Sequence, residues 1–265
     1  MEIFRPAHPT GTGVLVLTGS SGRVDTQRAM LFAEHGAIAL PLQWFGGPGQ
    51  SPGPWEIPVE TFTSALDHLE KEADSLVIVG VSFGAEAALV TASLDPRVRA
   101  VAAFAPTHVI WAGYDQSQQR WTSHWSWRGR RLPFVPIHRP STPAPDQGPP
   151  SYLPVYRASL RAASAEVLEQ ATIRVENIPE MLLVSGGDDQ VWPSADFARA
   201  IESRRASHGL DTVHVHLPEA GHRTVLPGER APDGGRAMTR GGTPEADSAL
   251  GQMAWPRLLT TLRLH

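Results

Sequence analysis

Short apolar runs rich in β-branched residues alternate along most of the chain with longer stretches whose apolar residues recur at helical spacing. The runs that predict strands are residues 14–17, 37–40, 76–81, 98–104, 181–184 and 213–217. The stretches that predict helices are residues 26–35, 59–71, 85–94, 194–208 and 247–264. Strands that alternate with helices are typical of parallel sheets joined by crossover connections. The pattern therefore predicts an α/β fold with a doubly wound, mostly parallel sheet, and we expect residues 1–265 to form a single domain.

Three segments interrupt this alternation. Residues 45–58, FGGPGQSPGPWEIP, form a glycine- and proline-rich loop after the strand that ends near residue 40, at the sheet end where open α/β sheets bind ligands. Residues 226–247 form a second such loop. The third segment, about residues 107–156, holds four tryptophans, at positions 111, 121, 125 and 127, followed by a proline-rich stretch. Because so many prolines do not suit a crossover helix, we expect this insertion to be a cap or lid over the sheet edge.

The strand at residues 76–81 leads directly into a serine with a glycine two positions before it and another two positions after it, GVSFG. The pattern G-x-S-x-G between a buried strand and a helix is typical of a nucleophile elbow. Such a turn strains the backbone at the serine, and the glycines let strand and helix approach closely. The motif predicts that Ser82 is a nucleophile at the carboxyl end of the sheet. The plainer alternative is a serine in a small-residue turn without chemistry.

A serine hydroxyl is a weak nucleophile near neutral pH and needs a base that a carboxylate orients. His222 follows the last predicted strand, and Asp188 and Asp189 follow the strand before it, which gives the order serine, acid, histidine expected after a nucleophile elbow. The G-x-x-D spacing from Gly186 favours Asp189 as the acid. Asp188 is then expected to be a loop or capping carboxylate, but it remains the alternative.

Acyl transfer also needs N–H groups that stabilise the oxyanion. One candidate is the backbone N–H of Phe83, directly after the nucleophile. The second is expected from the loop after the first strand, LTGSSG, where Ser20 is the first choice and Ser21 the close alternative. A plain glycine turn between a strand and a helix would explain the same loop without any chemistry.

Composition and charge narrow the classes of function. The net charge of -4 and the pI near 6.3 provide no basic field for nucleic acid or an anionic membrane surface. The absence of cysteine excludes disulfides, thiolate metal sites and a cysteine nucleophile. No stretch approaches the roughly 20 apolar residues of a membrane helix, and the prolines near the N-terminus do not suit a signal peptide. We therefore expect a cytoplasmic protein without metal or cofactor, and the oligomeric state stays open.

Five stretches together resemble one known family. They are EIPVETFTSALDHL, GVSFGAE, SGGDDQVWPS, PEAGH and GGTPEADSALGQMAWPRLLTTLRLH, which are spread over most of the chain. They are similar to the C-terminal catalytic domain of acyl-CoA thioester hydrolases and bile acid-CoA:amino acid N-acyltransferases, within the α/β-hydrolase superfamily. The resemblance implies an α/β-hydrolase fold and a triad that acts on acyl-CoA thioesters. By position, the triad roles are carried over to Ser82, Asp189 and His222.

Two departures from the family pattern affect the expected reaction. Eukaryotic members have a β-sandwich domain before the catalytic one, whereas here the first strand begins near residue 14 and no such domain is expected. The amino-acid-conjugating branch resembles this pattern with a cysteine nucleophile, whereas this chain has Ser82. An oxygen ester on serine is open to cleavage by water, which favours hydrolysis over transfer to an amine.

The sequence thus predicts a serine hydrolase that cleaves acyl thioesters, with acyl-CoA as the first choice. We expect Trp44, Phe45 and Trp111 to line an apolar acyl channel. The alternatives are a carboxylesterase, lactonase or amidase for a small metabolite, or an acyltransferase to an amine. A ligand-binding protein that has kept the fold without catalysis is the remaining alternative. In each case the expected partner is a small molecule.

Overall fold

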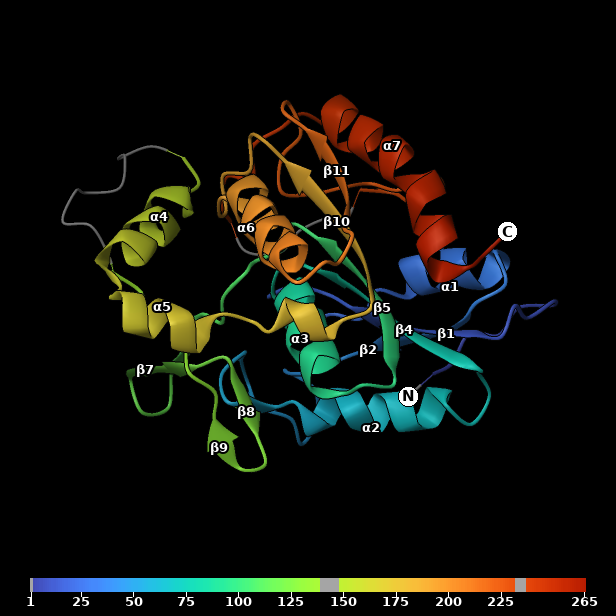
Figure 1. Ribbon diagram of the computed structural model, residues 1–265, viewed down its shortest axis with the longest axis horizontal. Coiled ribbons are helices and arrows are strands. Elements are labelled where there is room, and N and C mark those ends of the chain that lie inside the picture. The colour runs from blue at the N-terminus through green and yellow to red at the C-terminus, as the bar shows by residue number, and fades with distance from the viewer. Residues whose placement is uncertain (1, 139–147, 232–236) are drawn as a thin grey trace.

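A computed structural model describes residues 2–138, 148–231 and 237–265 (Figure 1). Its centre is a parallel six-stranded sheet with the order β11-β10-β5-β4-β1-β2. The strands are β1 (Thr12–Leu17), β2 (Ile38–Leu42), β4 (Ser75–Val81), β5 (Val98–Phe104), β10 (Glu180–Gly186) and β11 (Val213–Leu217). The main helices are α1 (Thr26–Glu34), α2 (Glu60–Leu69), α3 (Phe83–Leu94), α6 (Ser194–Ser207) and α7 (Pro244–Leu262). The predicted α/β fold with a doubly wound parallel sheet is confirmed.

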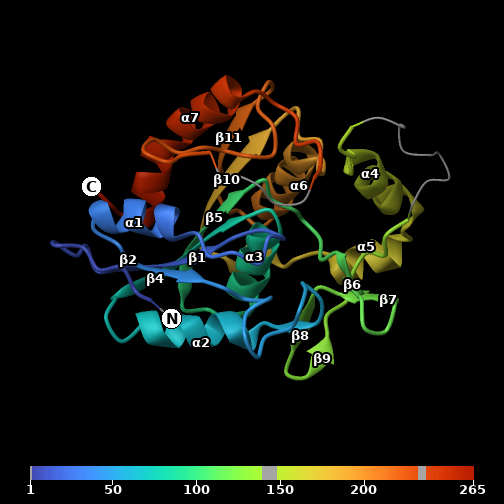
Figure 2. The ribbon, with the colours of Figure 1, turned by 180° about the vertical axis from the view of Figure 1, so that it is seen from behind.

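The sheet is covered by helices on both faces, with α1 and α7 on one face and α2, α3 and α6 on the other (Figures 1 and 2). Successive side chains of a strand point to opposite faces. In β1, Val14 and Val16 pack with residues of α1 and α7, whereas Leu15 and Leu17 pack with residues of α2 and α3. Burial on both faces explains why the strands other than β11, which is partly exposed, are largely continuous apolar runs in the sequence.

Two helices begin earlier than the periodicity predicts. Helix α3 begins at Phe83, because the sharp turn at Ser82 is followed directly by the first helical turn. Helix α7 begins at Pro244, and the side-chain oxygen of Thr243 accepts a hydrogen bond from Ala246 N. Threonine before the first turn and proline within it are typical of a helix start.

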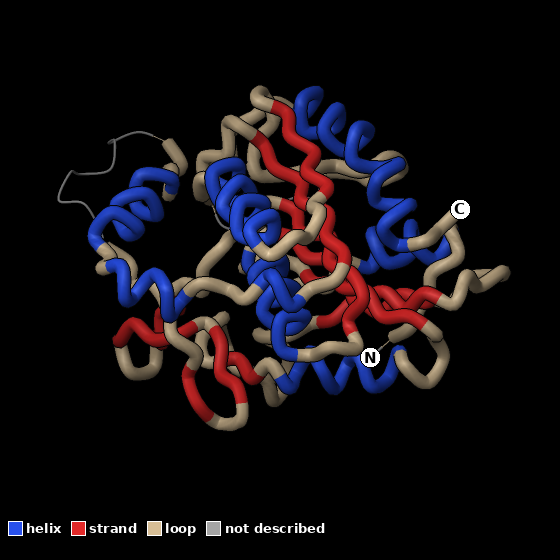
Figure 3. The backbone as a smooth tube through the Cα atoms, viewed as in Figure 1, coloured by secondary structure: helices blue, strands red, loops and turns tan. Residues whose placement is uncertain are grey.

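The connection from β5 to β10 contains several short elements that the sequence pattern does not predict (Figure 3). They are the strands β6 (Ala112–Asp115), β7 (Arg120–Ser123), β8 (Trp125–Trp127) and β9 (Arg130–Arg131), the helices α4 (Leu153–Ala162) and α5 (Ala165–Ala171), and the 3₁₀ turn η1 (Val175–Asn177). Strands β8 and β9 form a small sheet with β3 (Ile57–Pro58), which lies between β2 and α2 in the sequence. Residues 139–147 of the expected cap and residues 232–236 of the second predicted loop lie outside the described residues.

The four tryptophans of this segment have different surroundings. Trp111 and Trp125 are fully buried, whereas 41% of Trp121 is exposed and Trp127 is half-buried. The Trp111 ring lies 6.0 Å from that of Phe197 on α6, and the Trp125 ring lies 5.2 Å from that of Trp44. The two buried rings therefore join the inserted segment to the apolar core. Among the described helices, none has the length and apolar character needed to cross a membrane.

His108, just after β5, is a largely buried histidine in apolar surroundings. Its Nδ1 has no hydrogen-bond partner among the described residues, and its ring lies 5.1 Å from that of Phe197. Burial lowers the pKa of His108 from 6.5 to about 4. At a pH between these two pKa values, His108 binds a proton in the unfolded chain but not in the folded chain. This difference lowers the free energy of unfolding as the pH falls.

We expect His108 to reduce the free energy of unfolding at about pH 4.5 by about 2 to 3 kcal/mol relative to neutral pH. The substitution His108→Leu should remove this contribution, because leucine does not titrate and suits the apolar site. Urea unfolding of both proteins at the two pH values measures the difference. As a control, His8→Leu changes an exposed histidine and should leave the acid loss intact. An equal acid loss in wild type and H108L would contradict the prediction.

Candidate active site

Ser82 lies in a sharp turn between β4 and α3. Its backbone has φ 58° and ψ -123°, a conformation that residues other than glycine rarely adopt. A methyl group on Gly80 would lie 2.1 Å from Gly84 O, and one on Gly84 would lie 2.4 Å from Thr18 O. The turn therefore has the strained serine and the two glycine contacts of a nucleophile elbow.

The loop after β1 passes directly beside this serine. A methyl group on Gly19 would lie 3.0 Å from Ser82 Cβ and 3.5 Å from Ser82 Oγ. Strands β1 and β4 are neighbours in the sheet, and the chain leaves them towards opposite edges, to β2 and to β5. Such a switch point in the strand order is where open α/β sheets bind ligands. Ser20 follows Gly19 and is half-buried, whereas Ser21 is exposed and its Oγ accepts a hydrogen bond from Arg23 N.

Asp189 and His222, which are 33 residues apart in the sequence, meet at the ends of β10 and β11. His222 Nδ1 lies 2.8 Å from Asp189 Oδ2, and both side chains are buried. Asp189 Oδ1 accepts hydrogen bonds from the backbone N–H groups of Val191 and Trp192, at 2.9 and 3.2 Å. A carboxylate accepts hydrogen bonds, so His222 Nδ1 is the donor. This leaves His222 Nε2 with a lone pair that is able to accept a proton.

Asp188 has a different set of contacts. Its Oδ1 accepts a hydrogen bond from Gln190 Nε2, and its Oδ2 accepts one from Gly242 N, both at 2.8 Å. Asp188 therefore ties the loop after β10 to the turn that precedes α7. Of the two roles expected for Asp188, its contacts fit a loop carboxylate and not a cap of α6, and they favour Asp189 as the partner of His222.

Asp247 supports the histidine loop and was missed in the sequence analysis. Its Oδ1 accepts a hydrogen bond from Gly221 N at 2.7 Å, next to His222, and burial raises its pKa. The backbone N–H of His222 donates to Arg240 O at 3.0 Å. The helix-start signature at Thr243 and Pro244 does place Asp247 in the first turn of a helix. The sequence does not show which loop that turn contacts.

The three aromatic side chains expected to line an acyl channel lie in apolar clusters. Trp44 and Phe45 are buried with residues of α2 and α3, and Trp44 Nε1 donates a hydrogen bond to Thr18 O. Trp111 is buried in a second cluster with Trp192, and its Nε1 donates to Thr107 Oγ1. Their role in substrate binding stays a prediction.

A row of rings connects the nucleophile turn to the histidine. The Phe83 ring lies 5.6 Å from the Trp192 ring, and the Trp192 ring lies 5.8 Å from the His222 ring. Trp192 Nε1 also donates a hydrogen bond to Ala105 O, at the end of β5. Trp192 therefore contacts both halves of the site, a role that its position three residues after Asp189 does not reveal.

The comparisons with known proteins give the family of the chain. A family model described as "BAAT / Acyl-CoA thioester hydrolase C terminal" matches residues 57–265, which is most of the chain. The chain belongs to this family. The matched region includes Ser82, Asp189 and His222, whereas the loop with Ser20 precedes it.

One curated relative is acyl-coenzyme A thioesterase 6 of Mus musculus, which is 27% identical over 267 residues. The match covers 94% of this chain but 58% of the mouse protein, so the chain spans little more than half the length of this relative. The full activity of the mouse enzyme is therefore not transferred to this chain by similarity alone.

Two solved structures share the fold. A putative dienelactone hydrolase from Klebsiella pneumoniae matches with a TM-score of 0.53 and 14% identity, over 98% of this chain and 90% of that one. A puromycin-hydrolyzing peptidase from Mycobacterium tuberculosis matches with a TM-score of 0.54 and 16% identity, over 83% of this chain and 33% of that one. The α/β-hydrolase fold is thus confirmed, and family and fold together indicate a hydrolase.

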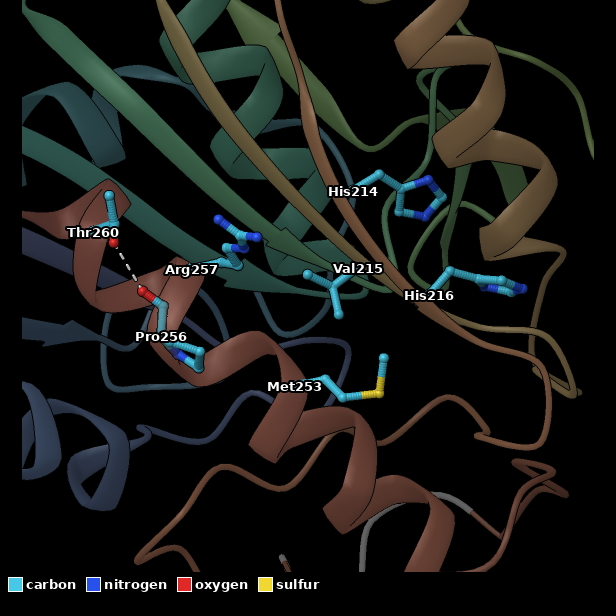
Figure 4. Close-up of a pocket in the computed structure, with 7 residues that line it drawn as sticks. All are labelled: His214, Val215, His216, Met253, Pro256, Arg257 and Thr260. Atoms are coloured by element: carbon cyan, nitrogen blue, oxygen red, sulfur yellow. Dashed lines mark hydrogen bonds between the residues drawn. The ribbon is translucent and has the colours of Figure 1, made fainter.

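A separate open groove lies between β11 and α7 (Figure 4). Its volume is about 730 Å³, and its lining residues are His214, Val215, His216, Met253, Pro256, Arg257 and Thr260. In Figure 4 the two histidines point away from the side on which Val215 lies. His214 Nδ1 is 2.8 Å from Glu202 Oε2, and His214 Nε2 is 2.8 Å from Ser185 Oγ. Ser185 is buried, so this serine does not face the groove as a nucleophile. The groove does not include any triad candidate, so we do not consider it the active site.

Proposed function

We propose that this chain is a serine hydrolase that cleaves acyl thioesters, with acyl-CoA as its substrate class. The hydrogen bond between Asp189 and His222, at the sheet end that also carries the strained Ser82 turn, is the observation that carries this proposal. Membership of the acyl-CoA thioester hydrolase family supports the thioester, and the serine nucleophile supports hydrolysis.

In the acylation step, Ser82 Oγ forms a bond to the acyl carbonyl carbon while His222 Nε2 takes the hydroxyl proton. Asp189 holds the protonated imidazole in orientation through Nδ1. The negative charge on the former carbonyl oxygen is stabilised by the backbone N–H of Phe83 and by that of Ser20. When the carbon–sulfur bond breaks, His222 returns the proton to the leaving thiolate.

In the deacylation step, water replaces the thiol. His222 Nε2 takes a proton from the water as its oxygen bonds to the acyl carbon of the Ser82 ester. Breaking of the bond to Ser82 Oγ then releases the free acid, and His222 returns the proton to the serine. The same N–H groups stabilise the oxyanion of this second step.

The direct test is thiol release from a panel of acyl-CoAs with short, medium and long chains. A chain without cysteine contributes no thiol background of its own. We expect release by the wild type and a loss on the order of 10⁴-fold or more in Ser82→Ala, which removes the nucleophile. Oxygen esters of the same acyl groups, assayed in parallel, measure the preference for the leaving group.

The outcomes separate the alternatives. Release that depends on Ser82 supports the thioesterase proposal and shows the acyl preference in the same experiment. If a fluorophosphonate labels Ser82 but no acyl-CoA is cleaved, the thioester assignment is wrong and the substrate is an ester or an amide. Without labelling or cleavage, the proposed catalytic role of Ser82 fails.

A further inference from the structure

Glu86 is a fully buried carboxylate one helical turn after Ser82 on α3. A buried carboxylate is costly unless hydrogen-bond donors surround it. Its Oε1 lies 3.0 Å from Trp111 N, 2.9 Å from Trp125 Nε1 and 3.1 Å from His124 Nδ1. All three donors belong to the segment inserted after β5. Glu86 therefore fixes the insertion to the nucleophile helix by three hydrogen bonds.

His124 extends this connection towards the reacting atoms. Its ring centre lies 4.3 Å from that of Phe83, the residue directly after the nucleophile. The backbone N–H of Phe83 is one proposed oxyanion donor. The Phe83 ring contacts the Trp192 ring, which in turn contacts the His222 ring. Contacts thus run without a break from the buried carboxylate to the base, by way of the ring next to Ser82.

The hairpin of β6 and β7 in the inserted segment packs too closely to shift relative to these rings. A methyl group on Gly113 of β6 would lie 2.5 Å from Pro54 O and 2.9 Å from His124 Cδ2. The His124 ring is therefore in close contact with the β6 backbone and with the Phe83 ring, while Glu86 binds its Nδ1.

We propose that Glu86 is a positioning residue, which acts through His124 to fix the Phe83 and Trp192 rings and thereby the alignment of Ser82 with His222. The proposal rests on the proposed function, since it assigns a role in the same acyl transfer. Glu86 does not touch the substrate. Its effect reaches the reacting atoms through the insertion, so the inserted segment acts as part of the catalytic framework.

The test compares Glu86→Ala and Glu86→Gln with the matched control Asp95→Asn. Asp95 is another buried carboxylate, at the opposite end of α3, where it pairs with Arg97. All three variants should be less stable than the wild type. Rates of Ser82 labelling by a fluorophosphonate are measured well below the unfolding midpoints, so that only folded protein is compared.

We expect labelling to be about 10-fold or more slower in E86A, several-fold slower in E86Q and unchanged in D95N. In E86Q an NH₂ group replaces one of the two oxygens that lie 3.1 and 3.2 Å from His124 Nδ1, so the contact with the ring is weakened. A folded E86A or E86Q that labels at the wild-type rate would overturn the proposal. If E86A does not fold, E86Q decides.

A readout independent of activity is the NMR resonance of the His222 ring protons, which the nearby Trp192 ring shifts. It should move in E86Q and stay in place in D95N. An unmoved resonance in E86Q would also overturn the positioning role. A wild type that is not labelled at all would overturn the proposed function instead, and the resonance would still decide the role of Glu86.

Discussion

Replacing Asp189 with asparagine is expected to lower turnover by about 10⁴-fold while the fold remains intact. An asparagine NH₂ in place of Asp189 Oδ2 would face His222 Nδ1 as a second donor. The ring then favours the tautomer with hydrogen on Nε2, which is unable to accept the Ser82 proton. Turnover of the preferred acyl substrate measures the loss, and circular dichroism with thermal unfolding checks the fold.

Asp188→Asn is the matched control for this prediction. It changes the neighbouring carboxylate, which contacts Gly242 N and Gln190 Nε2 and not the histidine. We expect a loss of turnover within about 10-fold, since the substitution weakens a loop contact without changing the tautomer of His222. If D188N lost far more turnover than D189N, the assignment of the acid would be reversed.

Gly84→Ala is expected to cost more than about 3 kcal/mol of the free energy of unfolding, or to prevent folding. The added methyl group would lie 2.4 Å from Thr18 O and 2.5 Å from Leu17 O, both backbone atoms of β1 and the loop that follows it. Neither atom can move away without shifting a central strand. Urea unfolding, together with the yield of soluble protein, measures the effect.

Gly209→Ala is the control, because there the added methyl group strains the backbone but meets no other atom of the described chain. Gly209 has φ +72°, and among the described residues, its two chain neighbours apart, no atom lies within 4 Å of the added methyl group, so the cost is about 1 to 2 kcal/mol of backbone strain. A G84A protein no less stable than G209A would show that the backbone contact at the elbow is not as close as the structure gives it.

The edge strand β11 is partly exposed, but the other five strands of the sheet were predictable from the sequence because they are buried on both faces. Such strands are continuous apolar runs, and the helices between them show their own period. The turn at Ser82 was predictable for a different reason, since close backbone contacts leave glycine as the only residue that fits at positions 80 and 84. In both cases the pattern that reveals the constraint lies in residues that are neighbours in the sequence.

The insertion after β5 was predictable only as an irregular segment. Its strands have two to four residues, too few to show a period, and their pairing depends on contacts with distant residues. Glu86 illustrates the same limit. On a helix of small apolar residues it is a lone carboxylate, and only the folded chain brings Trp111, His124 and Trp125 to it.

Helix α7 holds both sides of the catalytic histidine proposed here. Asp247 binds the N–H of Gly221 on one side, and a methyl group on Gly251 would lie 1.7 Å from Val225 O on the other. Both of these contacts come from residues that follow His222 in the sequence, so during synthesis the histidine loop gains them only after α7 has been made.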